Sequence, residues 1–145
     1  MFSHRIDEHT ELRLHHERHA EELFALVDRN REYLREWLPW VDRTTTVHVE
    51  RNFIKLWSES FGRGEMMSLG LWNLGKLAGT IGFTGVDSGN RTAEIGYWIS
   101  EDQQGKGLIT RSCVAVLDYG FSELNLNRIV LRAAVENTRS RAVAE

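Results

Sequence analysis

A strand, a polar loop with two glycines and an amphipathic helix follow one another between residues 95 and 121, and no other feature constrains the fold as strongly. The loop covers residues 101–107, with Lys106 between Gly105 and Gly107. A helix that begins directly after such a loop presents free backbone N–H groups, and its dipole adds partial positive charge there. Glycine lets the backbone approach a ligand closely. The segment predicts a site for a phosphate or diphosphate group, although a tight turn alone gives the same pattern.

Two other phosphate-binding loops match this segment poorly. A Walker loop requires G-x-x-x-x-G-K-[ST], and the sequence contains no such run. A dinucleotide fingerprint requires G-x-G-x-x-G directly after a strand. Here Thr110 occupies the third glycine position, and four polar residues separate Ser100 from the first glycine. A nucleotide-binding fragment of an oxidoreductase is therefore a weaker alternative.

The first third of the chain changes from a strand pattern to a helix pattern. Leu12 and Leu14 alternate with polar neighbours and predict a strand over residues 9–15. Apolar residues then recur with the spacing of a helix face, and they are Ala20, Leu23, Phe24 and Val27. This helix is expected to end near Leu38, because Pro39 disfavours the helical conformation of the residue before it.

The remaining elements predict a mixed α/β (α+β) domain. A second helix is expected from Thr45 or Thr46 to near Gly62. Three antiparallel strands follow at residues 67–72, 76–86 and 92–99. The helix after the glycine loop has an apolar face formed by Ile109, Cys113, Val116, Leu117 and Phe121. A strand at residues 128–135 and the start of a helix at 137–145 complete the order, which predicts one central, mostly antiparallel sheet flanked by helices.

Composition limits the classes of partner. The 145 residues carry a net charge of −3, which gives no basic footprint for nucleic acid. No apolar run approaches the roughly 20 residues that span a bilayer, so no membrane partner is expected. The lone Cys113 precludes an internal disulfide, and with no signal peptide at the N-terminus a cytoplasmic setting is predicted. Three histidines, His15, His16 and His19, lack the Cys or carboxylate cluster of a metal site, and no metal is expected.

Four segments, taken in order, resemble the GNAT acetyltransferase superfamily. They are residues 93–99 (Ala-Glu-Ile-Gly-Tyr-Trp-Ile), 105–110 (Gly-Lys-Gly-Leu-Ile-Thr), 127–129 (Asn-Arg-Ile) and 134–140 (Ala-Val-Glu-Asn-Thr-Arg-Ser). The resemblance is closest to the RimJ/RimL-like branch, whose members acetylate the N-termini of ribosomal proteins, and residues 12–14 and 37–40 are similar to that branch too. It implies a GNAT fold and acetyl-CoA as cosubstrate.

The resemblance also implies a cofactor site. The diphosphate would lie on backbone N–H groups of the loop and helix start, which are those of Gln104, Gly105, Lys106, Gly107, Leu108, Ile109 and Thr110. The pantetheine arm would run beside the strand at Trp98, Ile99 and Ser100, where the family usually has a β-bulge that opens a cleft. Asn137 would hydrogen-bond this arm. Asp102 departs from the family pattern, because a carboxylate near a diphosphate is unfavourable unless it points away.

The predicted reaction is direct attack by an amine on the thioester in a ternary complex. Ser140 would lie near the sulfur and protonate the thiolate. The alternative is a serine that does no more than cap its helix. An α-amine, with a pKa of about 7.7–8.0, needs only a weak base. Glu94 is the candidate base, with a purely structural strand position as the alternative. Trp37 and Trp40 would line the acceptor cleft, or belong to the core.

The acceptor is predicted to be the N-terminal α-amine of a protein, most simply a ribosomal one. A small-amine (polyamine or antibiotic) acetyltransferase and an acyl-CoA-binding module without turnover are the alternatives. Residues 1–145 are expected to form a single GNAT domain that lacks the last two strands of the family fold. Because an incomplete sheet would expose apolar surface, association into a homo-oligomer is a further expectation.

Overall fold

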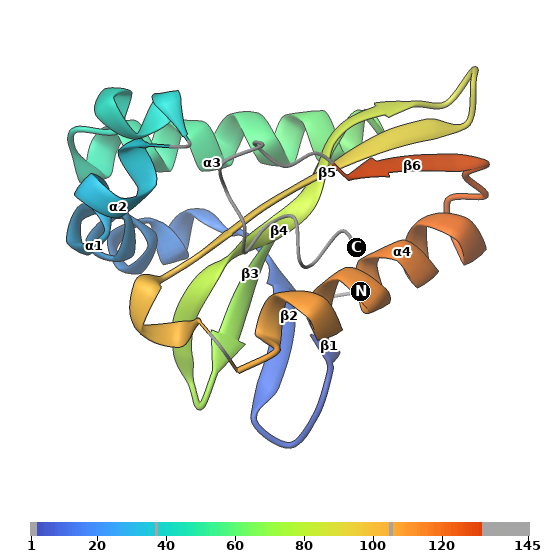
Figure 1. Cartoon of the computed structure of the whole chain (residues 1–145). Helices are drawn as coiled ribbons and strands as arrows, with labels where there is room; N and C mark the ends of the chain where they lie inside the picture. Colours follow the sequence, from blue (N-terminus) through green and yellow to red (C-terminus); the bar gives the residue numbers. More distant parts are fainter. Residues whose placement is uncertain (1–2, 37, 105, 132–145) are drawn as a thin grey trace.

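The computed structural model describes residues 3–36, 38–104 and 106–131, and its centre is a six-stranded sheet with helices on both faces (Figure 1). The strands are β1 (Ser3–Arg5), β2 (Thr10–Leu14), β3 (Met67–Asn73), β4 (Lys76–Asp87), β5 (Thr92–Ile99) and β6 (Arg128–Leu131). The α-helices are α1 (Ala20–Arg29), α2 (Arg31–Arg35), α3 (Val47–Gly62) and α4 (Leu108–Ser122). Three short 3-10 helices are η1 (Glu17–His19), η2 (Pro39–Arg43) and η3 (Glu101–Gln103).

The strand order in the sheet follows the order in the chain, β1-β2-β3-β4-β5-β6. Neighbouring strands are antiparallel except β5 and β6, which run parallel. A parallel pair needs a crossover connection, and α4 supplies it. The predicted α/β fold with a mostly antiparallel sheet is confirmed. No helix in the described ranges is long and apolar enough to cross a membrane.

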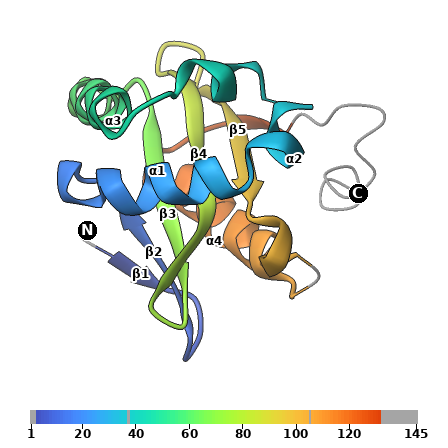
Figure 2. The same ribbon diagram turned by 90° about the vertical axis from the view of Figure 1, so that its left-hand side faces the viewer.

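Each face of the sheet has its own apolar core. In Figure 2, α1 lies in front of the strands and α4 behind them. The core on the α4 face is mainly aliphatic and includes Leu69, Leu71, Ile81, Phe83, Ile95, Cys113 and Val116. The core on the α1–α3 face combines aliphatic residues of the helices with aromatic residues of the strands, and includes Leu23, Val27, Ile54, Trp72 and Trp98. The side-chain alternation of the strands separates these two sets.

Most of the predicted elements are confirmed. The β5 strand has the predicted bounds, and α3 begins after Thr46, whose hydroxyl accepts a hydrogen bond from the Val49 N–H at 3.2 Å. The sequence did not indicate β1, which pairs with β2 as a hairpin. On α4 the predicted apolar face ends at Gly120 rather than Phe121, because position 120 packs on Phe83 and Ile129 while Phe121 is exposed. Val135 and the predicted helix from residue 137 lie outside the described residues.

The single helix expected up to residue 38 is broken at Asn30 into α1 and α2. The side-chain amide of Asn30 donates to the backbone oxygen of Leu26 at 2.8 Å and to the hydroxyl of Ser100 at 3.1 Å. Its side-chain oxygen accepts from the backbone N–H of Glu101 at 3.0 Å. Asn30 therefore joins the break between the helices to the end of β5, immediately before the glycine loop.

The register shifts lie in β4 and not at Trp98 and Ile99 of β5. One is in the pairing of β4 with β3, where the extra residue is Ala78, and the other is in the pairing of β4 with β5. From the Gly79–Ile99 pair to the Phe83–Ile95 pair, β4 and β5 keep one continuous register. The shift comes between Phe83 and Gly85, so the extra residue is Thr84 of β4. The pairing of β5 with β4 beside Trp98 and Ile99 is regular, and the bulge instead re-aims β4 at the opposite end of the pair.

Candidate active site

The start of α4 has the geometry of an anion site. Gly107 is the N-cap and adopts φ 72° and ψ 13°, a left-handed conformation that suits glycine. Leu108 and Ile109 bury their side chains in the core of the α4 face, at 3% and 6% exposure. Because these side chains point inward, the backbone of the first turn lies at the surface.

The first amides of α4 have no protein partner within the described residues. No side chain caps the helix. Arg111 is the first residue whose N–H bonds back, to the Gly107 oxygen at 3.1 Å, and no described loop carbonyl or side chain accepts from Leu108, Ile109 or Thr110. The first helical N–H groups are unpaired within a helix, so they are directed at any anion that binds there. Among the residues predicted to hold a diphosphate, Leu108, Ile109 and Thr110 have this geometry, whereas the Gln104 N–H bonds the Glu101 oxygen at 3.4 Å and Gly105 lies outside the described residues.

Arg111 adds positive charge to this loop, which the sequence analysis missed. Its guanidinium folds back one turn, donates to the Lys106 backbone oxygen at 3.0 Å and pairs with Asp7 at 3.3 Å. The Lys106 ammonium lies 3.3 Å from the side-chain oxygen of Gln103. The helical spacing from Gly107 to Arg111 was the signal in the sequence, since residues four apart share one face.

Asp102 points away from the start of α4. Its carboxylate accepts a short hydrogen bond from the Ser100 hydroxyl, which also lies beside Asn30. This bond is the main cause that lowers the pKa of Asp102, and Arg29 of α1 contributes to the same shift. The carboxylate is thus held on the α1 side of the loop, which removes the conflict expected with a diphosphate.

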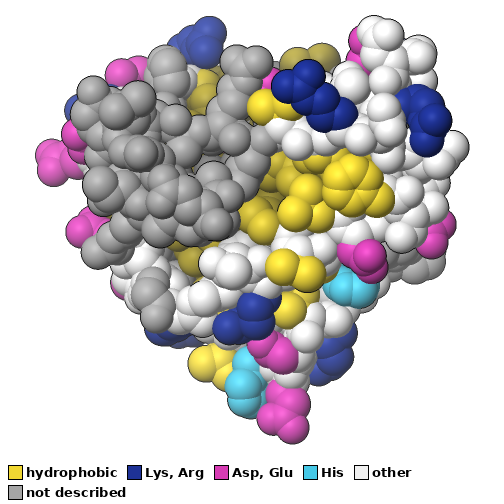
Figure 3. All heavy atoms as spheres, turned by 45° about the vertical axis from the view of Figure 1, so that its right-hand side comes forward, with side chains coloured by type: hydrophobic (Ala, Val, Ile, Leu, Met, Phe, Trp, Pro, Cys, Tyr) yellow, Lys and Arg dark blue, Asp and Glu magenta, His cyan; other side chains and the backbone are white. Residues whose placement is uncertain are grey.

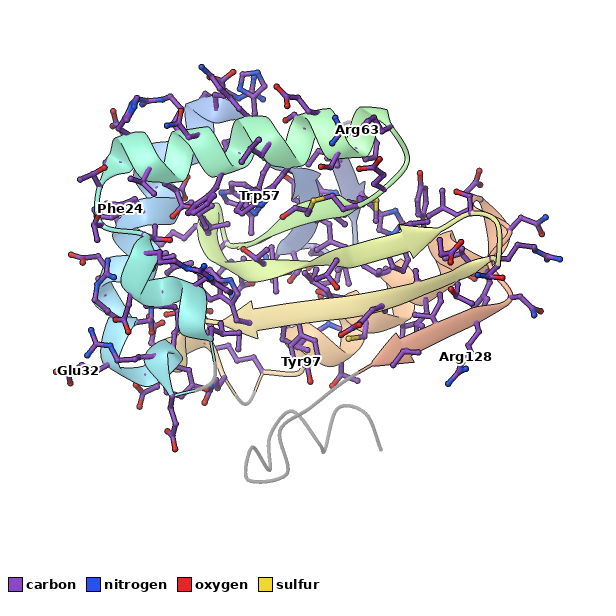
Figure 4. All side chains as sticks on the ribbon, turned by 90° about the horizontal axis from the view of Figure 1, so that it is seen from above. Phe24, Glu32, Trp57, Arg63, Tyr97 and Arg128 are labelled. Atoms are coloured by element: carbon purple, nitrogen blue, oxygen red, sulfur yellow. The ribbon has the colours of Figure 1, made fainter. Side chains whose placement is uncertain are left out.

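Within the described part of the chain, β6 pairs with β5 only at residues 92–95. The Ser100 N–H bonds the Ala78 oxygen of β4 at 2.7 Å. In an antiparallel ladder such bonds alternate, so Trp98 also turns its backbone groups to β4, while Tyr97 and Ile99 turn theirs outward. Figure 4 shows Tyr97 beside β5 on the side away from β4.

Among the three residues predicted to pair with pantetheine, only Ile99 therefore offers outward backbone groups. The Ser100 side chain is buried and bonded to Asn30 and Asp102. Trp98 sends its side chain to the opposite face of the sheet. Tyr97 packs against the core of the α4 face. Apolar side chains gather at the surface in the view of Figure 3, next to the residues drawn in grey.

A pocket of about 360 Å³ lies between α3 and the sheet. Its walls are mainly aromatic and apolar, formed by Leu23, Val27, Leu38, Trp40, Phe53, Trp57, Met66, Met67, Phe83, Tyr97 and Trp98. Its smaller and polar lining residues are Thr44, Glu50, Ser68, Thr80, Gly82, Thr84 and Gly96. Trp57 projects from α3 toward the strands (Figure 4). Trp40 lines this pocket, and its ring lies 6.2 Å from that of Trp98.

Small residues in one row across the sheet make room for this pocket. Ser68, Gly82 and Gly96 are cross-strand partners on β3, β4 and β5. A Cβ atom on Gly96 would come within 2.7 Å of the Thr84 methyl group. The absence of a side chain at position 96 thus leaves space on the sheet side of the pocket.

Glu50 is the only charged residue among the described lining residues. It sits in the first turn of α3, is 2% exposed, and its Oε2 atom has no hydrogen-bond partner within the described residues. Burial raises the pKa of Glu50 to about 7. The sequence gave no hint of this position beyond its helical spacing to Phe53, Ile54 and Trp57.

His15 is the second buried titratable group on this face. Its Nε2 lies 3.3 Å from the Thr80 hydroxyl, and its ring packs against Trp57 and Trp72. Burial lowers the pKa of His15 to about 3. Within the described residues no three His, Cys, Asp or Glu side chains come together as a metal site would require. Cys113 is buried on the α4 face, where desolvation raises its pKa to about 11.

The remaining predicted residues are placed only in part. Glu94 precedes Gly96 by two residues on the same face of β5, and it is not a lining residue of the pocket. Trp37, Asn137 and Ser140 lie outside the described residues. The structure therefore brings together one predicted acceptor residue, Trp40, with Glu50, which the sequence analysis missed.

The sequence matches the family "Acetyltransferase (GNAT) domain" over residues 9–145. Since this match covers most of the chain, the protein belongs to the GNAT acetyltransferase family, which makes it an acetyl-CoA-dependent N-acetyltransferase.

Individual relatives sharpen the comparison. A putative ribosomal N-acetyltransferase of Bacillus subtilis, YdaF, is 38% identical over all of this chain and 80% of its own length. A ribosomal-protein-serine acetyltransferase of Escherichia coli is 29% identical over 97% of this chain and 78% of its own. The solved structure of RimL, a ribosomal-protein α-N-acetyltransferase in complex with coenzyme A, superposes with a TM-score of 0.93 at 28% identity, over 97% of this chain and 79% of that one.

Proposed function

We propose that the enzyme transfers the acetyl group of acetyl-CoA to the N-terminal α-amine of a protein, by direct attack in a ternary complex. The observation that carries this proposal is that one strand, β5, borders both candidate sites. Its end at Ile99 leads through η3 and the glycine loop to the anion site of α4, and Gly96 and Trp98 line the aromatic pocket. Two substrates held on either side of one strand can meet without a covalent enzyme intermediate.

The cofactor would bind along the loop and the outer edge of β5. The amides of residues 108–110 hold the diphosphate, and Arg111 supports its charge, whereas the Gln104 N–H that the sequence also proposed bonds the Glu101 oxygen at 3.4 Å. The outward backbone groups of Ile99 pair with the pantetheine arm, in the way that an added strand would. The N–H of Ile99 is the proposed donor to the acetyl oxygen in the transition state, an interaction worth roughly 2.7–4 kcal/mol in comparable sites. Asn137 is the proposed additional partner of the arm.

Proton transfer would involve two residues proposed from the sequence. Glu94 acts as a base through water, and Ser140 protonates the departing thiolate. An α-amine with a pKa of about 7.7–8.0 is about a tenth neutral near neutral pH, whereas a lysine amine at about 10.4 is almost fully protonated. The modest base strength of a carboxylate therefore favours an N-terminal acceptor. The name of the E. coli relative, a ribosomal-protein-serine acetyltransferase, supports a ribosomal protein as acceptor.

A thiol-release assay tests this function. The enzyme is mixed with acetyl-CoA and with peptides that have a free or a blocked N-terminus, each containing one internal lysine, and spermidine serves as a small-amine acceptor. We expect release with free N-termini and none with blocked ones. Turnover of spermidine alone would show a small-amine acetyltransferase instead. Binding of coenzyme A by calorimetry without turnover of any amine would show a binding module.

A further inference from the structure

The orientation of Glu50 sets it apart from the other carboxylates of α3. Its backbone N–H closes the first helical turn on the Thr46 oxygen at 3.1 Å. Its side chain shares the inner face of the helix with Phe53, Ile54 and Trp57, whereas Glu59 on the same helix is exposed. The sequence thus places a carboxylate where the helix packs against the sheet.

Nothing in the described part of the chain compensates this buried carboxylate. Oε2 has no hydrogen-bond donor, and no described cation pairs with Glu50. Removing a carboxylate from water without a partner is unfavourable, so such a group is rarely kept only for stability. The carboxylate lines a pocket of about 360 Å³, which is large enough for a ligand to bring the missing donor.

The walls of the pocket indicate the chemistry of that donor. Trp40, Phe53, Trp57 and Trp98 surround the space with aromatic rings. Aromatic faces attract cations, and a desolvated carboxylate selects a positively charged hydrogen-bond donor. An ammonium group meets both requirements, whereas a carboxylate or phosphate group would be repelled by Glu50. The pocket therefore suits the charged end of an amine, with apolar atoms next to it.

We propose that Glu50 binds the ammonium group of the acceptor directly and accepts its proton, so that it is a catalytic residue of this enzyme. The inference rests on the function proposed above and deepens it by assigning the acceptor site. In this arrangement Glu94, which lies outside the pocket lining, is not the first acceptor of the proton.

The proposed acetyl transfer moves two protons away from the ammonium nitrogen. The ammonium gives one proton to a Glu50 carboxylate oxygen and becomes a neutral amine. The amine lone pair forms a bond to the acetyl carbon, the carbon–sulfur bond breaks, and its electron pair leaves on sulfur as thiolate. The second amine proton neutralises the thiolate, and Glu50 returns its proton to solvent. One acetyl group is transferred, and one proton is released overall.

The electrostatics of the pocket agree with this role. Burial raises the pKa of Glu50 to about 7, close to the roughly 7.7–8.0 of an α-amine, so the proton moves between groups of similar basicity. Other titratable or charged groups on this side of the sheet come from α1, α2, η1 and the segment after β2, and they include Glu22, Arg31, Tyr33, His15 and His19. Tyr97 borders the pocket from β5, but its side chain packs against the core of the α4 face. Arg31 donates to the backbone oxygens of Val41 and Thr44, not to a carboxylate of the pocket.

Steady-state kinetics of three variants test the assignment with an N-terminal peptide as acceptor. In Glu50→Gln we expect kcat/KM for the peptide to fall by about 100-fold or more, the usual range for loss of a general base, with KM for acetyl-CoA unchanged. Glu50→Asp, which keeps a shortened carboxylate, should recover part of this loss. Glu59→Gln, on the exposed side of α3, should match the wild type. Circular dichroism confirms that each variant is folded.

The pH profile separates a catalytic role from a structural one. The wild-type kcat should rise with pH around pH 7, and this rise should be absent from Glu50→Gln. A limb of the pH profile that shifts when an acceptor with a different amine pKa is used belongs to the acceptor. If Glu50→Gln keeps its activity within about twofold and retains the rise around pH 7, or if Glu94→Gln alone removes this rise, the inference is overturned. If the wild type releases no thiol with any amine, it is the proposed function that fails.

Discussion

The two faces of the sheet differ in what they bury. Toward α4 the strands present mainly aliphatic side chains such as Leu69, Ile81 and Ile95. Toward α1–α3 the same strands present glycines, threonines and tryptophans, and a pocket of about 360 Å³ remains between α3 and the sheet. Because side chains alternate along a strand, one set of strands supplies a packed core on one face and a binding site on the other.

Two of the buried titratable groups lie on the pocket side of the sheet, whereas Cys113 is buried on the α4 side. Glu50 and His15 both belong to the α1–α3 face, and burial shifts the pKa of each toward its neutral form. Burying such groups costs stability, which the aliphatic core of the opposite face must offset. The candidate acceptor pocket and the closely packed aliphatic core therefore lie on opposite faces of the sheet.

The largest effect is expected from a cavity in the α4 face. Ile81→Ala removes a fully buried side chain and should lower the free energy of unfolding by about 2–5 kcal/mol. Urea denaturation measures this loss. At a temperature where the variant is folded, its KM for the acceptor should match the wild type, because Ile81 does not line the pocket. A large change in this KM would break the division between the faces.

The second largest effect is a gain in stability on replacing Glu50, the buried carboxyl group of the pocket. A carboxyl group whose pKa rises from 4.5 to about 7 on folding binds protons more tightly in the folded state. The free energy of unfolding of the wild type therefore falls as pH rises between these two values, by roughly 3 kcal/mol, since each pKa unit corresponds to about 1.4 kcal/mol. Glu50→Gln should be the more stable protein above about pH 7, with the advantage vanishing near about pH 4.

Unfolding curves at several pH values measure this difference. His15 gives the opposite slope, because its lowered pKa makes stability fall as pH drops below 6.5 toward about 3. Comparing variant with wild type at each pH cancels the His15 contribution. A difference that is constant with pH would show that Glu50 is not buried as a carboxyl group.

Asn30 should produce an intermediate effect that links the helices to the cofactor loop. Asn30→Ala leaves buried partners at Leu26, Ser100 and Glu101 without their hydrogen bonds, which costs about 1–3 kcal/mol. Because the change lies at the start of the glycine loop, we expect KM for acetyl-CoA to rise more than KM for the acceptor. Asn52→Ala, exposed on α3, is the control. Equal effects of the two alanines on KM would contradict this role.

The smallest effect is expected at Arg111. Loss of one exposed positive charge near the diphosphate should raise KM for acetyl-CoA several-fold, or about 1 kcal/mol, and less at high salt. Arg111→Gln is compared with Arg63→Gln, a matched exposed arginine at the far end of α3 (Figure 4). A weaker affinity in both variants would indicate a general effect of net charge.

Local patterns in the sequence predicted most of the fold. The bounds of β5 and the cap at Thr46 follow from alternation and capping chemistry. The break at Asn30 could not be predicted, because its cause is a set of hydrogen bonds to residues about 70 positions away. For the same reason the bulge at Thr84 became visible only in the pairing of β4 with β5.

The part of the site that is built from consecutive residues could be predicted from the sequence, and the part that is built from several elements could not. The anion site depends on consecutive residues around Gly107, and the glycine pattern predicted it. The pocket depends on a row of small residues from three strands and on one side of α3, so Glu50 resembled any other helical glutamate in the sequence. Burial, which gives Glu50 its proposed chemistry, arises only from the tertiary structure.

A crystal structure with a conjugate of coenzyme A and an N-terminal peptide, joined through the sulfur, tests the central claim most directly. We expect the diphosphate on the amides of residues 108–110, the pantetheine arm along the β5 edge at Ile99, and the peptide nitrogen in the pocket within hydrogen-bonding distance of Glu50. A conjugate whose peptide lies outside this pocket, with the space between α3 and the sheet empty, would contradict the division of labour between the two faces.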